Sequence, residues 1–257
     1  MANCMRITYA AVTDIGLKRK RNEDAYLIEK RNLPGFSGGR QDIVLLGVAD
    51  GMGGHACGDV ASTMACDNLA GLAEESADLG FVAVERRMEE RFFQIDAILR
   101  NYGAAKGNCT DMGTTLSVLL LLPEKGIIAH VGDSRIYRVR NASLQRLTTD
   151  HSFIQELIDR GVLTEEAAAG HPYGNKLTNV IGAGEPLEEV QTDRIDIAPG
   201  DRFLLSTDGL HGDVGSEEIK TVLQTSPAPQ KAAERLLLLA LARGGRDNAT
   251  GIVAFLE

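Results

Sequence analysis

The sequence has few cysteines, and their number limits the kinds of protein it can be. Only Cys4, Cys57, Cys66 and Cys109 occur among the 257 residues, and no two of them form a Cys-x-x-Cys pair. Four scattered cysteines are too few for the disulfide framework of a small secreted domain. We therefore predict that they are reduced thiols in a cytoplasmic protein.

Long apolar runs are also absent. The longest, Val118–Leu122 and Leu236–Ala242, are far shorter than the ~20 apolar residues that a transmembrane helix needs. The first residues, from Met1 to Arg6, contain no apolar core of a signal peptide. Neither a membrane protein nor a secreted one is expected.

The sequence has no excess of basic residues. It contains 27 Lys and Arg against 36 Asp and Glu, which gives a formal net charge of −9. Binding to duplex nucleic acid depends on a basic face that neutralises phosphates, so this balance argues against such a partner. A hydrophobic content of 44% with 25% charged residues is ordinary for a globular domain.

Several short apolar segments rich in β-branched residues are typical of strands. Turn residues at 123–126 and 141–143 predict hairpins between neighbouring segments. The helical segments do not alternate with the strands one by one, which favours antiparallel sheets with helices packed outside them. The predicted strands are Arg6–Thr13, Ala25–Lys30, Ile43–Ala49, Thr114–Leu122, Gly126–Val131, Arg135–Arg140, Val190–Ile197, Arg202–Ser206 and Thr250–Leu256.

Apolar residues recur at helical spacing over 60–72 and again over 88–102, which predicts two helices with core-facing stripes. A third helix is predicted over Pro227–Arg243, and a shorter one begins near Ser216. The stretch from Asp150 to Pro186 instead mixes short helical pieces with many glycines. Such composition is typical of a surface insertion, where functional flaps occur.

Three apolar strands run into an aspartate that is followed by a small residue. These pairs are Asp50 with Gly51, Asp133 with Ser134, and Asp208 with Gly209. Two further acidic clusters lie at 22–24 and 246–248. One Asp-Gly pair is an ordinary turn signal. Three such strand ends together with two acidic clusters indicate that the carboxylates converge on one site.

Converging carboxylates require a cation. Two unit charges ~4 Å apart repel by about 4 kcal/mol at an effective dielectric constant near 20. A site built only from carboxylates favours Mg²⁺ or Mn²⁺, which prefer oxygen ligands. The five histidines show neither the His-x-His nor the His-Glu-x-x-His spacing, so a zinc site is disfavoured.

One basic cluster, from Lys18 to Arg21, directly precedes the acidic cluster at 22–24. It can be a solvated turn, or one of its arginines can face the carboxylates and hold an oxyanion. A guanidinium group matches phosphate with two parallel hydrogen bonds. Metal ions held by carboxylates beside an arginine indicate phosphoryl chemistry by a metal-activated water.

The same residues carry a resemblance to a known family. The segment from Thr13 to Asp24 resembles the opening TDxGxxRxxNED motif of the metal-dependent Ser/Thr protein phosphatases, the PPM or type 2C family. The segment from Val48 to His55 resembles the bacterial form of the family's DGxGGH motif. Later motifs match in order at 113–115, 131–135, 147–152, 205–209 and 245–250.

The resemblance implies an α+β fold: a four-layer α/β/β/α sandwich in which two antiparallel sheets are flanked by helices. It implies one catalytic domain over residues 1–257, with 150–186 as a flap-like insertion. It also implies hydrolysis of phosphoserine and phosphothreonine on proteins by a metal-activated water, without a phosphoenzyme. The chain ends on the predicted strand 250–256, so we expect no attached tail, membrane anchor or kinase domain.

Partners and location follow from the same resemblance. The partners would be phosphorylated proteins, such as a Ser/Thr kinase and its substrates, in signal transduction. We expect a cytoplasmic monomer that binds neither nucleic acid nor a membrane.

The resemblance further implies which residues bind metal. Asp50 would bridge two Mn²⁺ or Mg²⁺ ions, and the Gly51 carbonyl would join one of them. Asp208 and Asp247 would complete the shell of the first ion. Asp24 would serve the second ion, mostly through water, with support from Glu23 or Asn22.

Two more residues have implied roles. Arg19, the arginine of the RxxNED pattern, would clamp the substrate phosphate. Asp133, together with Asp208, would help to hold a third, weakly bound ion beside the two tightly bound ones and so take part in catalysis. The alternative for Asp133 is that it accepts backbone hydrogen bonds in the turn before Arg135.

The sequence departs from the family pattern at two places. Met52 stands where eukaryotic members have a histidine proposed as the general acid, and a thioether has no proton to donate. Protonation of the leaving group then falls to a metal-bound water or to another histidine, and we expect His55 to be structural. Gly174 stands in the flap where relatives often have arginine.

Two other functions compete with this hypothesis. A pseudophosphatase would use the same fold only to bind a phosphoprotein or a regulator, and would have lost a metal-binding aspartate. A metal-dependent nuclease or nucleotide hydrolase would also be rich in carboxylates. All the aspartates of the motif set are present, and the acidic balance counts against a nuclease.

Overall fold

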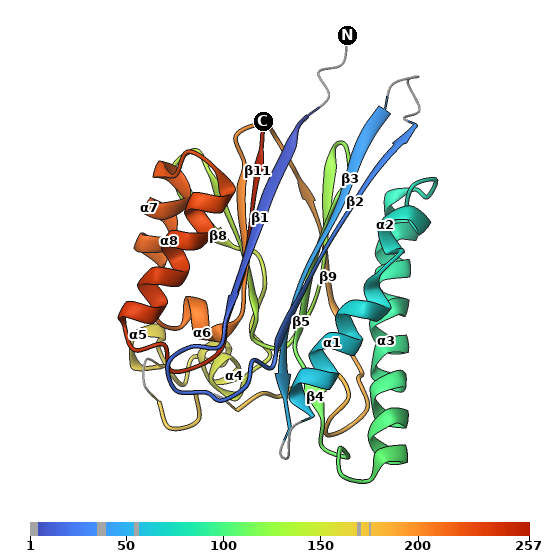
Figure 1. Ribbon diagram of the computed structural model, residues 1–257, viewed down its shortest axis with the longest axis vertical. Helices are drawn as coiled ribbons and strands as arrows, with labels where there is room; N and C mark the ends of the chain where they lie inside the picture. Colours follow the sequence, from blue (N-terminus) through green and yellow to red (C-terminus); the bar gives the residue numbers. More distant parts are fainter. Residues whose placement is uncertain (1–4, 35–39, 54–56, 169–170, 175) are drawn as a thin grey trace.

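In the computed structural model of the chain, residues 5–34, 40–53, 57–168, 171–174 and 176–257 are described. Their strands form two antiparallel sheets that pack face to face, with helices on both outer sides (Figure 1). The first sheet has the strand order β1 (Ile7–Asp14), β11 (Ala249–Leu256), β10 (Arg202–Ser206), β7 (Arg135–Arg140) and β8 (Ser143–Arg146). The second has the order β2 (Asp24–Pro34), β3 (Arg40–Met52), β5 (Leu116–Leu121), β6 (Lys125–Val131) and β9 (Gln191–Asp196), with the short β4 (Gly113–Thr114) paired to β3.

The helices form the two outer layers. The second sheet is covered by α1 (Gly58–Leu69), α2 (Leu72–Glu75) and α3 (Phe81–Lys106), and the first sheet by α7 (Ser216–Thr225) and α8 (Pro229–Ala242) (Figure 1). Three short helices, α4 (Phe153–Asp159), α5 (Glu165–Ala168) and α6 (Asp208–His211), lie at the end of the sandwich away from the two chain ends. The predicted four-layer α+β fold is therefore confirmed.

The buried apolar side chains form three hydrophobic cores, one between the sheets and one under each layer of helices. Strands such as β3 and β11 contribute to two of them, because their side chains point alternately to opposite faces. On β3, Val44 and Leu46 pack between the sheets, whereas Ile43 and Leu45 pack under the helices α1 and α3. On β11, Ile252 points between the sheets, and its neighbour Val253 packs under α7 and α8. Successive side chains of a strand point to opposite faces, so a strand covered on both faces has no polar face. This explains why these strands have unbroken apolar sequences.

Most predicted elements are present, and the differences are local. The predicted strand 114–122 is two strands, β4 and β5, and Asp50 lies within β3 rather than after its end. The turn at 141–143 joins β7 to β8, and both Asn141 and Ala142 adopt a positive φ, as a tight hairpin turn requires. The described part of 150–186 contains α4, α5 and two isolated bridges.

The prediction that all four cysteines are reduced is wrong for two of them. Cys57 and Cys109 form a disulfide, whereas Cys66 is a free thiol in the core, and Cys4 lies outside the described residues. The two sulfurs meet because Cys57 directly precedes α1 and Cys109 lies in the loop between α3 and β4. Packing of α1 beside α3 brings these loops together, which cysteine spacing alone does not reveal.

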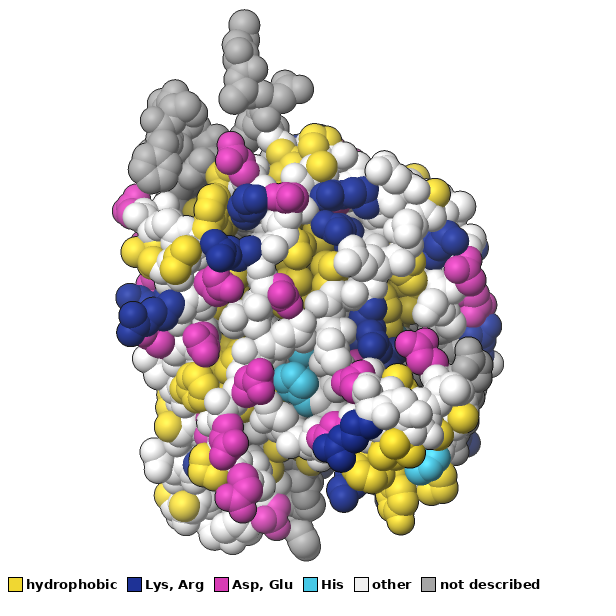
Figure 2. Space-filling view, turned by 180° about the vertical axis from the view of Figure 1, so that it is seen from behind, with side chains coloured by type: hydrophobic (Ala, Val, Ile, Leu, Met, Phe, Trp, Pro, Cys, Tyr) yellow, Lys and Arg dark blue, Asp and Glu magenta, His cyan; other side chains and the backbone are white. Residues whose placement is uncertain are grey.

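Charge is mixed on one face of the molecule. On the face shown in Figure 2, Lys and Arg side chains are interspersed with Asp and Glu side chains, with apolar groups between them. No described helix combines the length and the apolar character that crossing a bilayer requires.

Candidate metal and phosphate site

Five aspartates from five separate segments lie at the end of the sandwich that carries α6. Asp24 is the first residue of β2 and stands directly opposite Asp50 in the antiparallel pairing of β2 with β3. Like charges directly opposite on neighbouring strands destabilise a sheet. This pairing therefore requires that a proton or a cation compensates the two carboxylates.

The next two aspartates are brought together by the pairing of β10 with β11. Asp208 begins α6, directly after β10, and Asp247 lies just before β11. Gly209 permits this approach, because a Cβ atom built on it would lie 3.1 Å from Asp247 Cβ and 2.0 Å from the Asn248 carbonyl oxygen. Asp133, in the turn between β6 and β7, is the fifth aspartate.

Burial and the charges of neighbouring carboxylates shift the pKa of several of these aspartates. Burial and the charges of Asp208 and Asp247 raise the pKa of Asp24 to about 7. Burial, and then the charges of Asp24 and Asp208, raise the pKa of Asp50 well above its ordinary value. Burial and the nearby Asp208 raise the pKa of Asp133 to about 7. Desolvation and like charges both favour the neutral form of these three carboxyl groups.

Two carboxylate oxygens of the cluster have no hydrogen-bond partner. These buried atoms are Oδ1 of Asp24 and Oδ1 of Asp208. Leaving a buried polar atom unpaired is costly, more so for a charged group. Carboxylate oxygens that receive no hydrogen bond are suitable ligands for a hard divalent cation such as Mg²⁺ or Mn²⁺.

The carboxylates are neighbours, but they do not form a ready coordination sphere. Within the part of the chain that the structure describes, no three His, Cys, Asp or Glu side chains converge closely enough to hold an ion together. Side-chain hydrogen bonds fix some of them instead, since Thr207 Oγ1 donates to Asp24 Oδ2 at 2.8 Å. The unpaired carboxylate oxygens nevertheless fit a divalent cation by their chemistry.

Gly51 has a backbone environment that excludes any side chain. A Cβ atom on Gly51 would lie 2.0 Å from the Gly58 carbonyl oxygen and 2.5 Å from the Glu23 carbonyl oxygen. The Gly51 N–H donates to that Glu23 oxygen at 3.1 Å. The strand β3, the start of α1 and the segment before β2 therefore meet directly at Gly51.

Arg19 lies beside the carboxylates. Its Nη2 donates to Asp247 Oδ2 at 2.6 Å, and its Nη1 lies 3.9 Å from Glu23 Oε2. The hydrogen bond to Asp247 raises the pKa of Arg19, although burial opposes the rise. Its side chain is 48% exposed, so the guanidinium faces solvent on one side and the acidic cluster on the other.

Asn248, which had no role among the sequence-predicted site residues, organises the loop that carries Arg19. Its Nδ2 donates to the carbonyl oxygens of Ile15 and Arg21, and its Oδ1 accepts from the Glu23 N–H at 2.8 Å. One carboxamide therefore fixes both ends of the segment 15–23. The sequence offered one sign of this role, the position of Asn248 directly after Asp247 in a matched motif. Its hydrogen-bond partners lie more than 220 residues earlier in the chain.

The buried histidines bear on the general acid. Burial lowers the pKa of both His130 and His211 to about 3, so each is neutral near pH 7. Burial also lowers the pKa of His151. Met52, at the end of β3, is 38% exposed and offers no proton. His55 lies outside the described residues.

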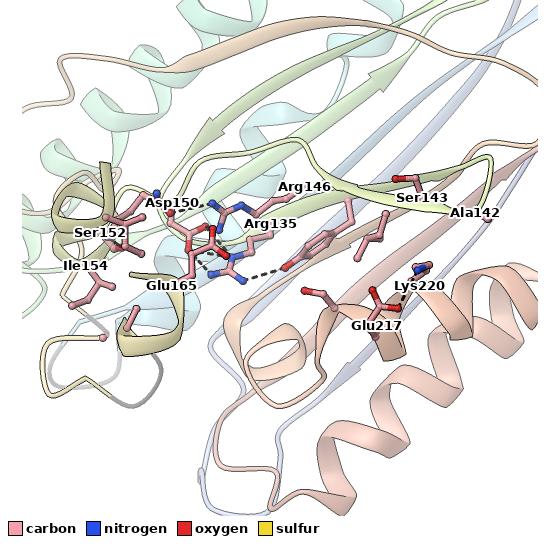
Figure 3. Close-up of a pocket in the computed structure, with 17 residues that line it drawn as sticks. Arg135, Ala142, Ser143, Arg146, Asp150, Ser152, Ile154, Glu165, Glu217 and Lys220 are labelled. Atoms are coloured by element: carbon pink, nitrogen blue, oxygen red, sulfur yellow. Dashed lines mark hydrogen bonds and ion pairs between the residues drawn. The ribbon is translucent and has the colours of Figure 1, made fainter. Parts of the chain in front are cut away.

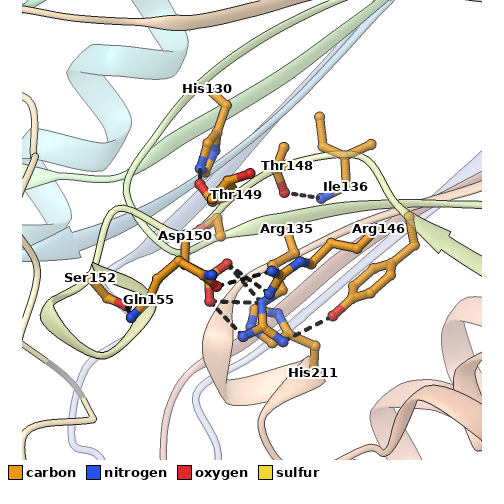
Figure 4. Close-up of polar contacts among 12 residues, drawn as sticks. His130, Arg135, Ile136, Arg146, Thr148, Thr149, Asp150, Ser152, Gln155 and His211 are labelled. Carbon is orange, nitrogen blue, oxygen red and sulfur yellow. Dashed lines mark hydrogen bonds and ion pairs between the residues drawn. The ribbon is translucent and has the colours of Figure 1, made fainter. Parts of the chain in front are cut away.

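A second polar cluster borders Asp133. Arg135 Nε and Nη2 donate to the two oxygens of Asp150 at 2.9 and 2.6 Å, and Nη1 donates to the Tyr137 hydroxyl (Figure 4). The same residues line a cavity of about 670 Å³ between β7, β8, α4, α5 and α7 (Figure 3). The Arg135–Asp150 pair thus connects the turn of Asp133 to the start of the predicted flap.

Comparison with known proteins places these features among phosphatases. The family model described as Protein phosphatase 2C matches residues 20–241. A putative protein phosphatase 2C-type of Streptococcus pyogenes is 35% identical over 240 residues, which cover 93% of each chain. The serine/threonine protein phosphatase PstP of Mycobacterium tuberculosis is 36% identical over 255 residues, which are 96% of this chain and 45% of that protein.

Solved structures give the same result. The serine/threonine phosphatase Stp1 from Staphylococcus aureus superposes with a TM-score of 0.89 at 31% identity, covering 100% of this chain and 98% of that one. The catalytic domain of PstP, solved in complex with two manganese ions, superposes with a TM-score of 0.83 at 32% identity over 98% of this chain and 99% of that one.

Proposed function

This chain belongs to the protein phosphatase 2C family, and we infer from this membership that it is a metal-dependent protein serine/threonine phosphatase. One observation supports the mechanism: buried carboxylates that have unpaired oxygens lie beside the half-exposed guanidinium of Arg19. Every relative described above is named as a phosphatase. None of them favours the pseudophosphatase or the nuclease hypothesis.

We propose that the five aspartates are the metal ligands. Asp50 would serve both of two ions, and the Gly51 carbonyl would join one of them. Asp208 and Asp247 would serve the first ion, and Asp24 the second. Burial and mutual repulsion, which raise the pKa of Asp24, Asp50 and Asp208, would then be offset by the cations. Asp24 and Asp208 contribute oxygens that no hydrogen bond uses.

The chain's own residues position the substrate. We propose that Arg19 exchanges its contact with Asp247 for the phosphate of the substrate, to which a guanidinium can donate two parallel hydrogen bonds. Asn248 keeps the Arg19 loop in place through its three hydrogen bonds. Ions held by the aspartates would lower the pKa of a bound water and neutralise phosphoryl charge. Because His130 and His211 are neutral near pH 7, neither can donate a proton to the leaving group.

The identity and number of the ions, the oligomeric state, the partners and the location are also proposals. We propose Mn²⁺ or Mg²⁺ as the ions, a third and weaker ion at Asp133, and a monomer formed by one catalytic domain. Phosphorylated proteins, including a Ser/Thr kinase and its substrates in signal transduction, would be its partners. We propose a cytoplasmic location because phosphoproteins are made where ATP is available.

A direct assay tests this function. Hydrolysis of a phosphothreonine peptide is measured with Mn²⁺, then with excess chelator, and again after Mn²⁺ is restored. We expect activity only when the cation is present. Activity on a dinucleotide or on single-stranded DNA, with none on the peptide, would favour the nuclease. Binding of the phosphopeptide without turnover would favour the pseudophosphatase.

A further inference from the structure

The disulfide between Cys57 and Cys109 joins two segments that flank the proposed metal site. The two cysteines are 52 residues apart in sequence, yet their Cα atoms lie 5.7 Å apart. Both side chains are buried, with exposed fractions of 3% and 7%. Cys57 is the residue immediately before α1, and Cys109 lies in the loop that leads from α3 into β4.

On the Cys57 side, the contact with the site is made by the next residue. The Gly58 carbonyl oxygen packs so closely on Gly51 that no Cβ atom fits between them. One turn further along α1, Ser62 Oγ donates to the Glu23 carbonyl oxygen, which also accepts from the Gly51 N–H. The start of α1 therefore forms one wall around the backbone of Gly51.

On the Cys109 side, the contact is made by the strand that follows. The pairing of β4 with β3 places Thr114 opposite Gly51. Thr114 Oγ1 and the Thr115 N–H both donate to the Asp50 carbonyl oxygen, at 3.0 and 2.9 Å, and Thr115 Oγ1 accepts from the Asp50 N–H. The Cys109 loop thus leads directly into the residues that hold the backbone of Asp50.

We propose that Cys57 and Cys109 form a reversible oxidation site that controls how tightly the Asp50–Gly51 segment holds divalent cations. The inference rests on the proposed function, because it assigns Asp50 and Gly51 to the metal site. In the disulfide form, the two segments that enclose Asp50 and Gly51 are joined covalently. In the dithiol form, they are held by packing and hydrogen bonds alone, and the ligand atoms are less firmly placed.

The oxidation requires a named electron acceptor, and a low-molecular-weight disulfide such as oxidised glutathione supplies it. One protein thiolate attacks the small disulfide and releases one small thiol, which leaves a mixed disulfide. The second protein thiolate then displaces the other small thiol. The protein loses two electrons and two protons, and the acceptor is reduced to two thiols. A cytoplasmic setting keeps most thiols reduced, so such a pair suits a redox-responsive role rather than a permanent bond.

Cys66 provides a matched control. It is buried in α1, nine residues beyond Cys57, and burial raises the pKa of its thiol to about 12. Among the described residues Cys66 is a free thiol without a disulfide partner, so the same treatment should close no intramolecular link there.

The test uses the full chain in two states, prepared with a reductant or with oxidised glutathione. Oxidised glutathione is preferred to a peroxide because it leaves the half-exposed Met52 unmodified. Peptide mapping should show the Cys57–Cys109 link only after oxidation. Calorimetric titration with Mn²⁺ should give binding at least about fivefold weaker in the reduced state. Cys57→Ser should bind like the reduced protein under both treatments, and Cys66→Ala should respond like the wild type.

The outcomes separate this inference from the proposed function. Equal Mn²⁺ affinity in the two states of the wild-type protein would overturn the inference and leave the metal site intact. If the link forms on oxidation but neither state binds Mn²⁺, both the proposed function and the inference are overturned. The comparison of two states of one protein needs no substitution, so it remains decisive if Cys57→Ser fails to fold.

Discussion

Arg19 donates a 2.6 Å hydrogen bond to Asp247, a residue 228 positions later in the chain. This bond joins the group proposed to bind phosphate to a group proposed to bind metal. In the absence of other cations, the guanidinium neutralises part of the acidic cluster. Binding of an ion by Asp247 would release Arg19 for the substrate.

Replacing Arg19 with alanine should therefore impair catalysis more than stability. Loss of a charge-assisted contact to phosphate costs roughly 1.5–3 kcal/mol, which predicts a fall in kcat/KM of about 10- to 150-fold. The ion pair itself is half-exposed, and such pairs contribute only about 0–1 kcal/mol to stability. Steady-state kinetics and thermal unfolding on one preparation measure both. Arg21→Ala is the matched control, and a severe effect there with a silent Arg19→Ala would contradict the assignment.

Asp208→Asn should abolish turnover and weaken Mn²⁺ binding. The substitution removes a proposed metal ligand, but it also removes a buried charge whose pKa is raised by burial and by Asp247. The chelator-treated variant should consequently unfold at a temperature equal to or above that of the chelator-treated wild type. Asp213→Asn serves as the control, because Asp213 is paired with Arg246 and lies five residues later. Near-normal turnover of Asp208→Asn with Mn²⁺ present would refute the ligand role.

Asp133→Ala distinguishes the two interpretations of this carboxylate. If Asp133 helps to hold a third ion, the variant should stay folded and keep two tightly bound ions, while turnover of a phosphopeptide falls by more than about tenfold, or ~1.4 kcal/mol of barrier. If Asp133 only fixes the turn before Arg135, the melting temperature should fall and the folded fraction should remain active. Bound metal, melting temperature and turnover are measured together. A folded, fully active variant would remove the third ion from the mechanism.

Acid should destabilise the protein through its buried histidines. The pKa of His130 and of His211 is about 3 in the folded chain, whereas an unfolded histidine titrates near 6.5. Between these values the unfolded state binds protons at the two histidines that the folded state does not, so their contribution to the free energy of unfolding falls as pH drops below about 6.5. Asp24 and Asp133, whose pKa is raised to about 7, contribute with the opposite sign. Urea unfolding of the wild type and of a histidine variant at several pH values between 4.5 and 8 isolates the contribution of the histidine.

His211→Asn should reduce the number of protons taken up on unfolding, which the slope of the unfolding free energy against pH measures, by about one. Ser206 Oγ lies 3.1 Å from His211 Nδ1, and an asparagine keeps a polar group for it. Above pH 7 the histidine is neutral in both states, so the difference between variant and wild type should there be independent of pH. An unchanged slope below pH 6.5 would show that His211 is protonated in the folded protein.

The sequence by itself determined the layers of the fold and the types of residue at the site. Strands such as β3 and β11 need a cover on both faces because their sequences offer no polar face, and the family resemblance implied the four-layer order. Asp50, Asp133 and Asp208 were identified because each follows an apolar segment, and Arg19 because it matches the arginine of a family motif. Both kinds of information are local, and so they can be read along the chain.

Only the tertiary structure decided which groups face one another. The opposition of Asp24 to Asp50, the bond of Arg19 to Asp247 and the disulfide of Cys57 with Cys109 all join segments distant in sequence. Such contacts are fixed by strand register and by the packing of α1 against α3, not by local propensity. The same holds for the pKa of each buried carboxylate, because burial and neighbouring charge exist only after the chain has folded.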